Sequence, residues 1–183
     1  HHAWSPDSRW LAYTQNTPTY FNRLSLYSVA DGKSYPVSDG LADATSPVFD
    51  ASGKYLYFLA STDAGPVNDW FSQANADMRA VQQVYVAVLA KGVPSPLAKE
   101  SDEEKPKKAD AAGGEKKPDE AKKPDADKKE PFSIDVDGIQ HRILALPVQA
   151  GDLFNLQVGD TGHFYYQRRD DRDVSLHHYD LAK

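Results

Sequence analysis

One pattern of residues occurs twice in this chain, and the two copies begin 45 residues apart (49 − 4 = 45). Each copy has an aromatic residue, a four-residue turn, a basic residue and an apolar strand: "WSPDSRWLAYT" begins at Trp4 and "FDASGKYLYFL" at Phe49. A repeating unit of this length is too small to bury both faces of its own sheet. The repeat therefore predicts sheets that pack against neighbouring copies of themselves.

Further matches extend the repeat. "LSLYSVADG" at 24–32 aligns with "VYVAVLAKG" at 84–92, and a weaker third copy reads "GHFYYQ" at 162–167 followed by "SLHHYDLAK" at 175–183. Units of about 40–45 residues with several short strands each are typical of β-propeller blades. We predict an all-β fold with two near-complete propeller blades and part of further blades. A β-sandwich in which the similarity arises by chance is the alternative.

The alignment predicts which strands correspond. Tight turns at 6–8 and 51–53 set the register of the following hairpins. We expect strand 9–14 to match 54–60, strand 24–29 to match 82–89, and the outer strand 34–37 to match 95–98.

The second copy carries an insertion around residues 61–80, because the offset between the copies grows from 45 to 60. Asn68 or Asp69 could cap a short helix there. That helix would carry Trp70, Phe71, Ala74 and Met78 on one side. We expect this apolar side to fold onto the blade, with a recognition loop as the alternative.

Composition divides the chain into three parts. Residues 100–130 hold eleven acidic residues and nine lysines, and they contain no Val, Ile, Leu or aromatic residue. Such a segment cannot bury enough apolar area to offset its ordering entropy. We therefore expect two blades in 3–99, a disordered charged linker in 100–131, and the truncated start of further blades in 132–183.

Charge and residue usage exclude several functions. Outside the linker, 12 basic residues (21 − 9) face 16 acidic ones (27 − 11), so the folded part gives no electrostatic reason to expect a nucleic-acid partner. No apolar run approaches the ~18 residues that span a bilayer. The chain has no cysteine, which excludes disulfides and thiolate metal sites but does not choose a compartment.

Few residues offer chemistry of their own. The chain contains no G-x-S-x-G motif for a nucleophilic serine. His177 and His178 are adjacent on a predicted strand and should point to opposite faces, so they cannot jointly hold one metal ion. We expect His141 and His163 at strand starts, in surface or packing roles, and interpret His1 and His2 as tag residues. We predict no catalytic, cofactor-binding or metal-binding residue, and no cofactor.

Two charged motifs allow a binding interpretation beside a structural one. Asp135 and Asp137 share one face of a strand at i, i+2, which would suit a cation, although a turn before Gly138 is the simpler explanation. The arginine pair in "QRRDDRD" at 167–173 could hold a peptide carboxylate. The alternative for this second motif is a solvated loop of offsetting charges.

The turn "SPDS" at 5–8 resembles the propeller repeat of TolB-like proteins, tricorn-type proteases and prolyl-oligopeptidase relatives, with Ser8 where glycine is usual and Ala51 where proline is usual in the second copy. The stretch 132–156 resembles the segment D-[LF]-D-G-I-x-x-R-[IV]-x-x-L-P-V-x-x-G of bacterial tricorn-like serine proteases. The matching residues are Asp135, Val136, Asp137, Gly138, Ile139, Arg142, Leu146, Pro147, Val148 and Gly151.

The resemblance implies a serine-protease parent with propeller modules, a PDZ-like domain and a catalytic core. This chain matches propeller segments only, so it would be a non-catalytic part that admits or orients peptides and unfolded proteins for a distant active site. Periplasmic localisation is the expectation from bacterial family members, and the cytoplasm is the alternative. Two other functions remain open: a TolB-like protein-binding propeller of the cell envelope, and the propeller cap of a prolyl-oligopeptidase-type hydrolase.

Two expectations follow for the isolated chain. It should hydrolyse no peptide, because its motifs supply no nucleophile–base pair. It should also expose an apolar sheet face or an unpaired edge, because two blades and part of a third cannot close a ring. We therefore expect it either to form homo-oligomers or to be less stable than the same blades within the parent.

Overall fold

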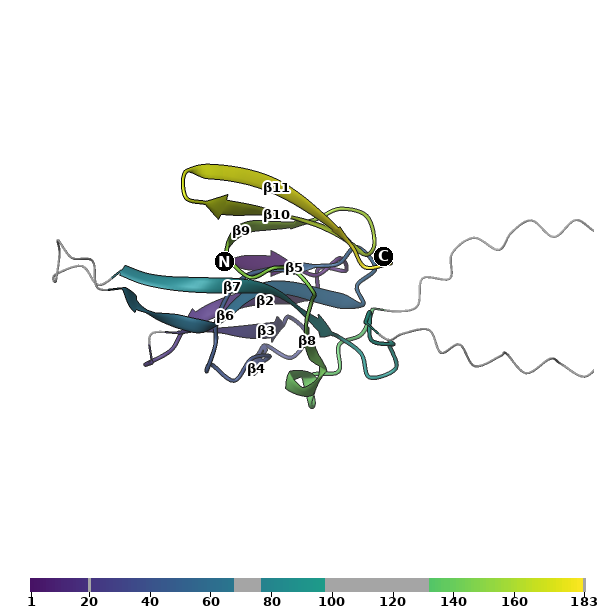
Figure 1. Cartoon of the computed structure of the whole chain (residues 1–183). Helices are drawn as coiled ribbons and strands as arrows, with labels where there is room; N and C mark the ends of the chain where they lie inside the picture. Colours follow the sequence, from purple (N-terminus) through teal and green to yellow (C-terminus); the bar gives the residue numbers. More distant parts are fainter. Residues whose placement is uncertain (20, 68–76, 98–131, 183) are drawn as a thin grey trace, which may run out of the picture.

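The described residues form three antiparallel β-sheets (Figure 1). The computed structural model describes residues 1–19, 21–67, 77–97 and 132–182. The first sheet contains β1 (His2–Trp4), β2 (Trp10–Asn16), β3 (Asn22–Ser28) and β4 (Lys33–Pro36). The second contains β5 (Asp43–Phe49), β6 (Tyr55–Val67), β7 (Asp77–Val88) and β8 (Ile143–Ala145), and the third β9 (Asp152–Val158), β10 (His163–Asp170) and β11 (Asp173–Asp180). The short helix η1 (Ile139–Arg142) precedes β8.

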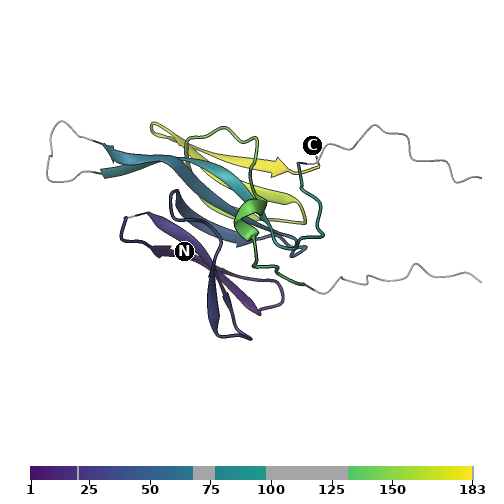
Figure 2. The same cartoon turned by 90° about the horizontal axis from the view of Figure 1, so that it is seen from below.

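The second sheet lies between the other two (Figures 1 and 2). One buried cluster, which includes Leu24 and Leu56, fills the space between the first and second sheets. Another, which includes Val84 and Phe164, fills the space between the second and third. Sheets that pack face to face in series are the arrangement of propeller blades, so the predicted fold class is confirmed.

Strand β6 shows why the sequence "YLYFLA" folds in this way. Alternate side chains of a strand point to opposite faces. Leu56 and Phe58 point to the first sheet, whereas Tyr57 and Leu59 point to the third, and all four are at most 2% exposed. An almost continuously apolar strand is required because both of its faces are buried.

The turn between the first two strands of each sheet is the conserved element of the repeat. Ser8, Gly53 and Gly162 occupy it with φ values of 59°, 72° and 78°. The turn in the third sheet is one residue shorter: the Gly159 amide bonds to the carbonyl of His163, four residues on, whereas the corresponding bonds in the other two turns span five residues. The aligned copies therefore correspond to real structural repeats, with a one-residue shift in the third.

The outer strand of the second sheet is not where the alignment placed it. Residues 95–97, the described part of the expected strand 95–98, lie in a loop and turn, and β8 pairs with β7 through Ile143–Ala145 instead. Pro94 and Pro96 explain the difference, because proline has no backbone N–H to donate to a strand ladder. The second sheet is thus completed by the part of the chain that was expected to begin further blades.

Both ends of the insertion at 61–80 belong to strands and lengthen the hairpin of β6 and β7. Residues 61–67 belong to β6 and 77–80 to β7, and the two strands pair as far as Val67 and Asp77. The expectation of helix is therefore wrong for residues 77–80, which include Met78. The remainder of the expected helix, 68–76, lies outside the described residues, as does the expected linker 100–130. No helix in the described part of the chain is long and apolar enough to cross a membrane.

Candidate functional site

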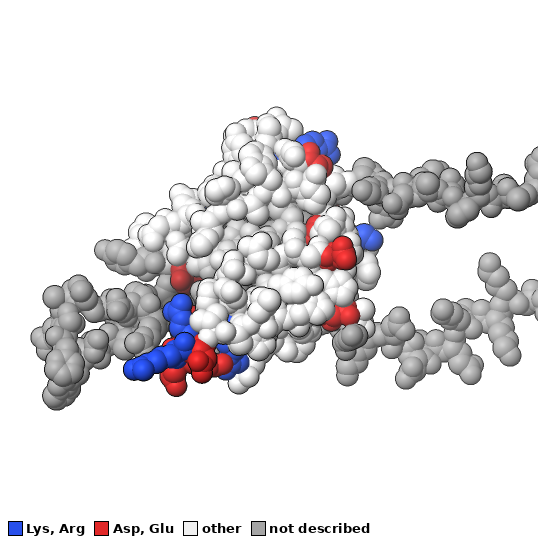
Figure 3. Space-filling model, turned by 90° about the horizontal axis from the view of Figure 1, so that it is seen from above, with Lys and Arg blue, Asp and Glu red and all other residues white. Residues whose placement is uncertain are grey.

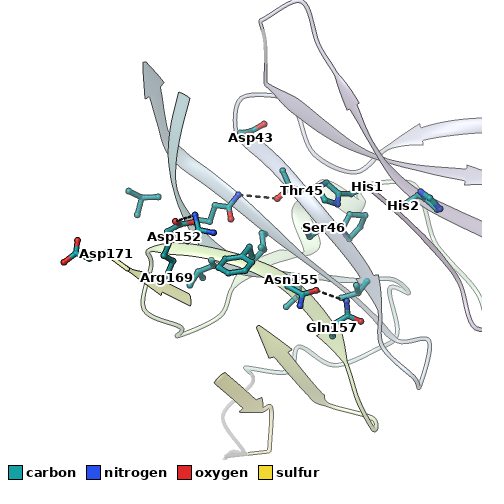
Figure 4. Close-up of a pocket in the computed structure, with 18 residues that line it drawn as sticks. His1, His2, Asp43, Thr45, Ser46, Asp152, Asn155, Gln157, Arg169 and Asp171 are labelled. Atoms are coloured by element: carbon teal, nitrogen blue, oxygen red, sulfur yellow. Dashed lines mark hydrogen bonds and ion pairs between the residues drawn. The ribbon is translucent and has the colours of Figure 1, made fainter. Parts of the chain in front are cut away.

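The first strands of the three sheets converge on an open groove (Figure 4). Its volume is about 1240 Å³. We call it the inner-strand groove; it is lined by His1, His2, Asp43, Thr45, Ser46, Pro47, Val48, Leu59, Val81, Gln82, Asp152, Leu153, Phe154, Asn155, Leu156, Gln157, Arg169 and Asp171. In a propeller, blades surround a central channel, and this groove runs along the strands that would border it.

Polar groups in the groove are held in place by short-range contacts. Arg169 Nη1 lies 3.4 Å from Asp152 Oδ2, and its guanidinium lies 5.0 Å from the centre of the Phe154 ring. Asp43 Oδ1 accepts hydrogen bonds of 2.8 Å from the backbone and side-chain amides of Asn22. Both Arg169 and Asp152 remain about half exposed. The groove therefore offers charged and polar contacts to a ligand but no enclosed pocket.

The arginine pair in "QRRDDRD", for which carboxylate binding was one interpretation, divides between two different neighbours. Arg168 Nε lies 3.0 Å from Asp170 Oδ1, and Arg169 pairs with Asp152. Only Arg169 lines the groove. The structure therefore does not bring the two guanidinium groups together as one carboxylate site.

The histidines pack mainly against aromatic rings. His177 stacks on Tyr166, and His178 stacks on Tyr165, so the adjacent histidines point to opposite faces as predicted. His163, at the start of β10, places Nδ1 3.0 Å from His178 Nε2. This pair supplies only two nitrogen ligands, and the described residues contain no group of three that could hold a metal ion.

Two details of the histidines differ from expectation. His141 lies in η1 rather than at a strand start, because the sequence "IQHR" forms a helical turn before β8. Ser175 Oγ lies 2.8 Å from His177 Nε2, so the fold does bring one serine and one histidine together. Among the described residues no carboxylate orients His177, and Ser175 lies within a regular strand rather than on a strained turn. This pair lacks the features that activate a serine nucleophile.

The two aspartates of the "DVDG" motif both contact Lys91. They lie in the loop and turn before η1 rather than in a strand. Asp135 Oδ2 accepts a 2.7 Å hydrogen bond from the Lys91 backbone amide, and Lys91 Nζ lies 3.0 Å from Asp137 Oδ2. The hydrogen bond and charge of Lys91 lower the pKa of Asp137. Their role in the structure is to fix this turn beside the end of β7.

Arg142 completes that fixation. Its guanidinium donates to the backbone carbonyls of Val88 and Leu89 on one side and of Asp135 and Asp137 on the other. The fan of five N–H donors in arginine suits several carbonyl acceptors at once. The motif that the sequence analysis singled out therefore anchors β8 to the second sheet.

Replacing Arg142 by methionine should lower the free energy of unfolding by about 2–4 kcal/mol, because charge-assisted bonds are lost and carbonyl groups are left without a donor. Urea titration followed by tryptophan fluorescence measures the change. Lys91→Met is the matched control, since it removes only an exposed ion pair and should have a small effect. Equal losses in the two variants would contradict the anchoring role of Arg142.

A buried carboxylate that the sequence analysis missed joins the second and third sheets. Asp50 is fully buried and accepts hydrogen bonds from Tyr57 Oη at 3.2 Å and from the Gly162 amide at 2.9 Å. It also accepts bonds from the backbone and hydroxyl of Ser52 in its own turn. Burial, reinforced by the charge of Asp50, raises the pKa of Tyr57. The only signal in the sequence was an acidic residue between an aromatic strand end and a turn.

Similarity to known proteins agrees with this architecture. The chain is 34% identical over 86 residues to a tricorn protease homolog of Saccharolobus solfataricus and 30% identical over 112 residues to the tricorn protease of Thermoplasma volcanium. These matches cover 47% and 58% of the chain but 8% and 11% of those proteins. Tricorn protease homolog 1 of Streptomyces coelicolor is 26% identical over 86% of the chain and 14% of its own length.

The fold and the family are also matched over the whole chain. A crystal structure of the tricorn protease superimposes with a TM-score of 0.63 at 18% identity, covering 99% of this chain and 17% of that one. A family model described as the second β-propeller domain of tricorn protease matches residues 1–183. The chain thus spans under a fifth of these relatives. It belongs to the family of tricorn protease second β-propeller domains.

Proposed function

We propose that this chain serves as a non-catalytic propeller part of a tricorn-type serine protease and that peptides pass along its inner-strand groove. The observation that carries the proposal is the groove itself, a space of about 1240 Å³ bordered by the first strands of the sheets. Its open, half-exposed polar lining is suited to transient contact rather than tight capture. The role is to admit or orient peptides and unfolded segments for a distant active site.

The exposed face of the third sheet supports membership of a larger propeller. Tyr165 is opposite His178 in the same way that the buried Tyr57 is opposite Val86 in the second sheet. Tyr165 is 38% exposed and Leu176 70% exposed. Charged residues gather toward the margins of the molecule when it is seen from the third-sheet side (Figure 3). We place the next blade of the parent on this face; homo-oligomers of the isolated chain remain an alternative.

Site-specific photo-crosslinking tests the peptide path. A photoreactive phenylalanine analogue replaces Phe154 in the groove or, as the matched control, the exposed Leu41. Short fluorescein-labelled peptides and an unfolded, alkylated protein are the probes. We expect several-fold more crosslinking at position 154 than at 41, and competition by unlabelled peptide. Equal labelling at the two positions would overturn the proposal.

The same samples separate the rival functions. A TolB-like binding module should crosslink folded proteins as well as unfolded ones, whereas a peptide path should prefer the unfolded probe. Hydrolysis of the peptides is followed in parallel, with Ser175→Ala as the control for the Ser175–His177 pair. We expect no turnover, and turnover that Ser175→Ala abolishes would overturn the non-catalytic assignment.

A further inference from the structure

The first strands of the second and third sheets carry the same irregularity where they border the groove. The pairing of β5 with β6 shifts register between Thr45 and Val48, and that of β9 with β10 shifts opposite the Tyr165–Gln167 stretch. In both sheets two residues of the first strand lie opposite one residue of the second. These are Ser46 and Pro47 opposite Phe58, and Asn155 and Leu156 opposite Tyr166. Each sheet therefore has a β-bulge at the equivalent position.

Each bulge contains a residue in a left-handed backbone conformation. Ser46 has φ 51° and Asn155 has φ 52°. In the described part of the chain, the other positive-φ residues that are not glycine, Ser8 and Asp171, belong to turns. A left-handed conformation costs a non-glycine residue about 1 kcal/mol or more. The chain therefore has this unfavourable backbone conformation in two strands, at equivalent positions along the inner-strand groove.

These strands are also the edges of their sheets. Among the strands of the described residues, β5 and β9 each pair with one neighbour, and the other side of each borders the groove. A regular edge strand is a template to which any extended polypeptide can add as a further strand. Bulges, prolines and charged side chains are the features that prevent such pairing. β5 combines a bulge with Pro47 and Asp43, and β9 combines a bulge with Asp152.

We infer that the bulges at Ser46–Pro47 and Asn155–Leu156 prevent a polypeptide in the inner-strand groove from pairing with the edges of β5 and β9. The ligand class is extended, unfolded peptide, including β-prone apolar sequences, held through side-chain contacts and not through its main chain. The inference rests on the proposed peptide path. It adds that peptides can move along the groove because they cannot pair as a further strand with the edge of β5 or β9.

Deleting Asn155 tests the inference, because it leaves Leu156 alone opposite Tyr166 and makes β9 regular without changing the register on either side of the bulge. Asn155→Gly is the matched control, since glycine adopts positive φ freely and keeps the bulge. The probe is an alternating Thr-Val peptide with isotope-labelled main-chain carbonyls. Its infrared amide band reports strand pairing, and fluorescence anisotropy reports affinity.

We expect no strand-type band with the unmodified chain or with Asn155→Gly, and a strand-type band with about tenfold tighter binding after the deletion. A strand-type band with the unmodified chain would overturn the inference, as would a folded deletion variant without this gain. If that variant does not fold, deletion of Pro47, which removes both the bulge and the proline from β5, repeats the test there, and the spectrum of the unmodified chain still decides. If no crosslinks form at position 154, the proposed peptide path fails. The inference about the bulges is still tested, because the gain of strand pairing on deletion is measured separately.

Discussion

Replacing Gly53 by alanine is expected to lower the free energy of unfolding by about 2–4 kcal/mol. Gly53 has φ 72°, a conformation in which an added Cβ is strained. That Cβ would also lie inside van der Waals contact with the Phe132 ring, 2.8 Å from Cε2. The ring cannot move freely because it packs edge-on against Phe49 in the core between the first two sheets. Urea denaturation measures the loss.

Two variants separate the strain from the clash. Gly32 has φ 62°, but its nearest neighbour to an added Cβ is the Tyr27 hydroxyl at 3.9 Å, so Gly32→Ala should cost only about 1 kcal/mol. Phe132→Ala combined with Gly53→Ala should be less damaging than the sum of the single changes, because the clash is gone. Equal costs for Gly53→Ala and Gly32→Ala would show that Phe132 does not cover the turn.

Replacing Asp50 by alanine should cost about 3–5 kcal/mol, because the buried Tyr57 hydroxyl and the part-buried donors of Ser52 and Gly162 lose one acceptor together. The Gly162 amide, whose bond to Asp50 joins the second and third sheets, cannot turn toward another partner. We expect β9–β11 to detach first, which hydrogen exchange on those strands would detect as lost protection. Asp50→Asn should lose less, since one acceptor oxygen remains, and it provides a folded variant if the alanine variant unfolds.

Asp7 provides the control for Asp50. The two turns exchange their residues: Ser5 and Asp7 occupy the positions of Asp50 and Ser52, and in each turn the serine hydroxyl bonds to the aspartate. All hydrogen bonds of Asp7 stay within its own turn, so Asp7→Ala should cost about 1 kcal/mol and leave the third sheet in place. Loss of protection in β9–β11 after Asp7→Ala would contradict the bridging role of Asp50.

Local patterns in the sequence were sufficient to predict the turns and the central strands. The four-residue turns and the apolar run of β6 carry their information within about ten residues, because turn chemistry and side-chain alternation are local properties. β8 could not be found in this way. It has three residues, and its pairing with Tyr85–Ala87 depends on the contacts of Arg142 rather than on strand propensity.

The groove was equally inaccessible to sequence analysis. β5 reads "DATSPVF", in which Pro47 argues against a strand, and β9 has a bulge that breaks its alternation. Both strands form because they pair with β6 and β10, whose residues favour strands more clearly. The groove exists only where β5 and β9 converge. The histidine positions on β11 were predicted correctly because adjacent residues of a strand must point to opposite faces.

The late position of β8 sets an order in which the chain can fold during synthesis. β7 ends at Val88 and its outer neighbour begins at Ile143, whereas β9 begins only a few residues later, at Asp152. All strands of the first sheet have been synthesised once Pro36 has been made. In the second sheet, the outer edge of β7 has no partner until β8 has been synthesised. By then the first strand of the third sheet is close behind. The second and third sheets should therefore become stable as one cooperative unit, whereas the first can form ahead of them.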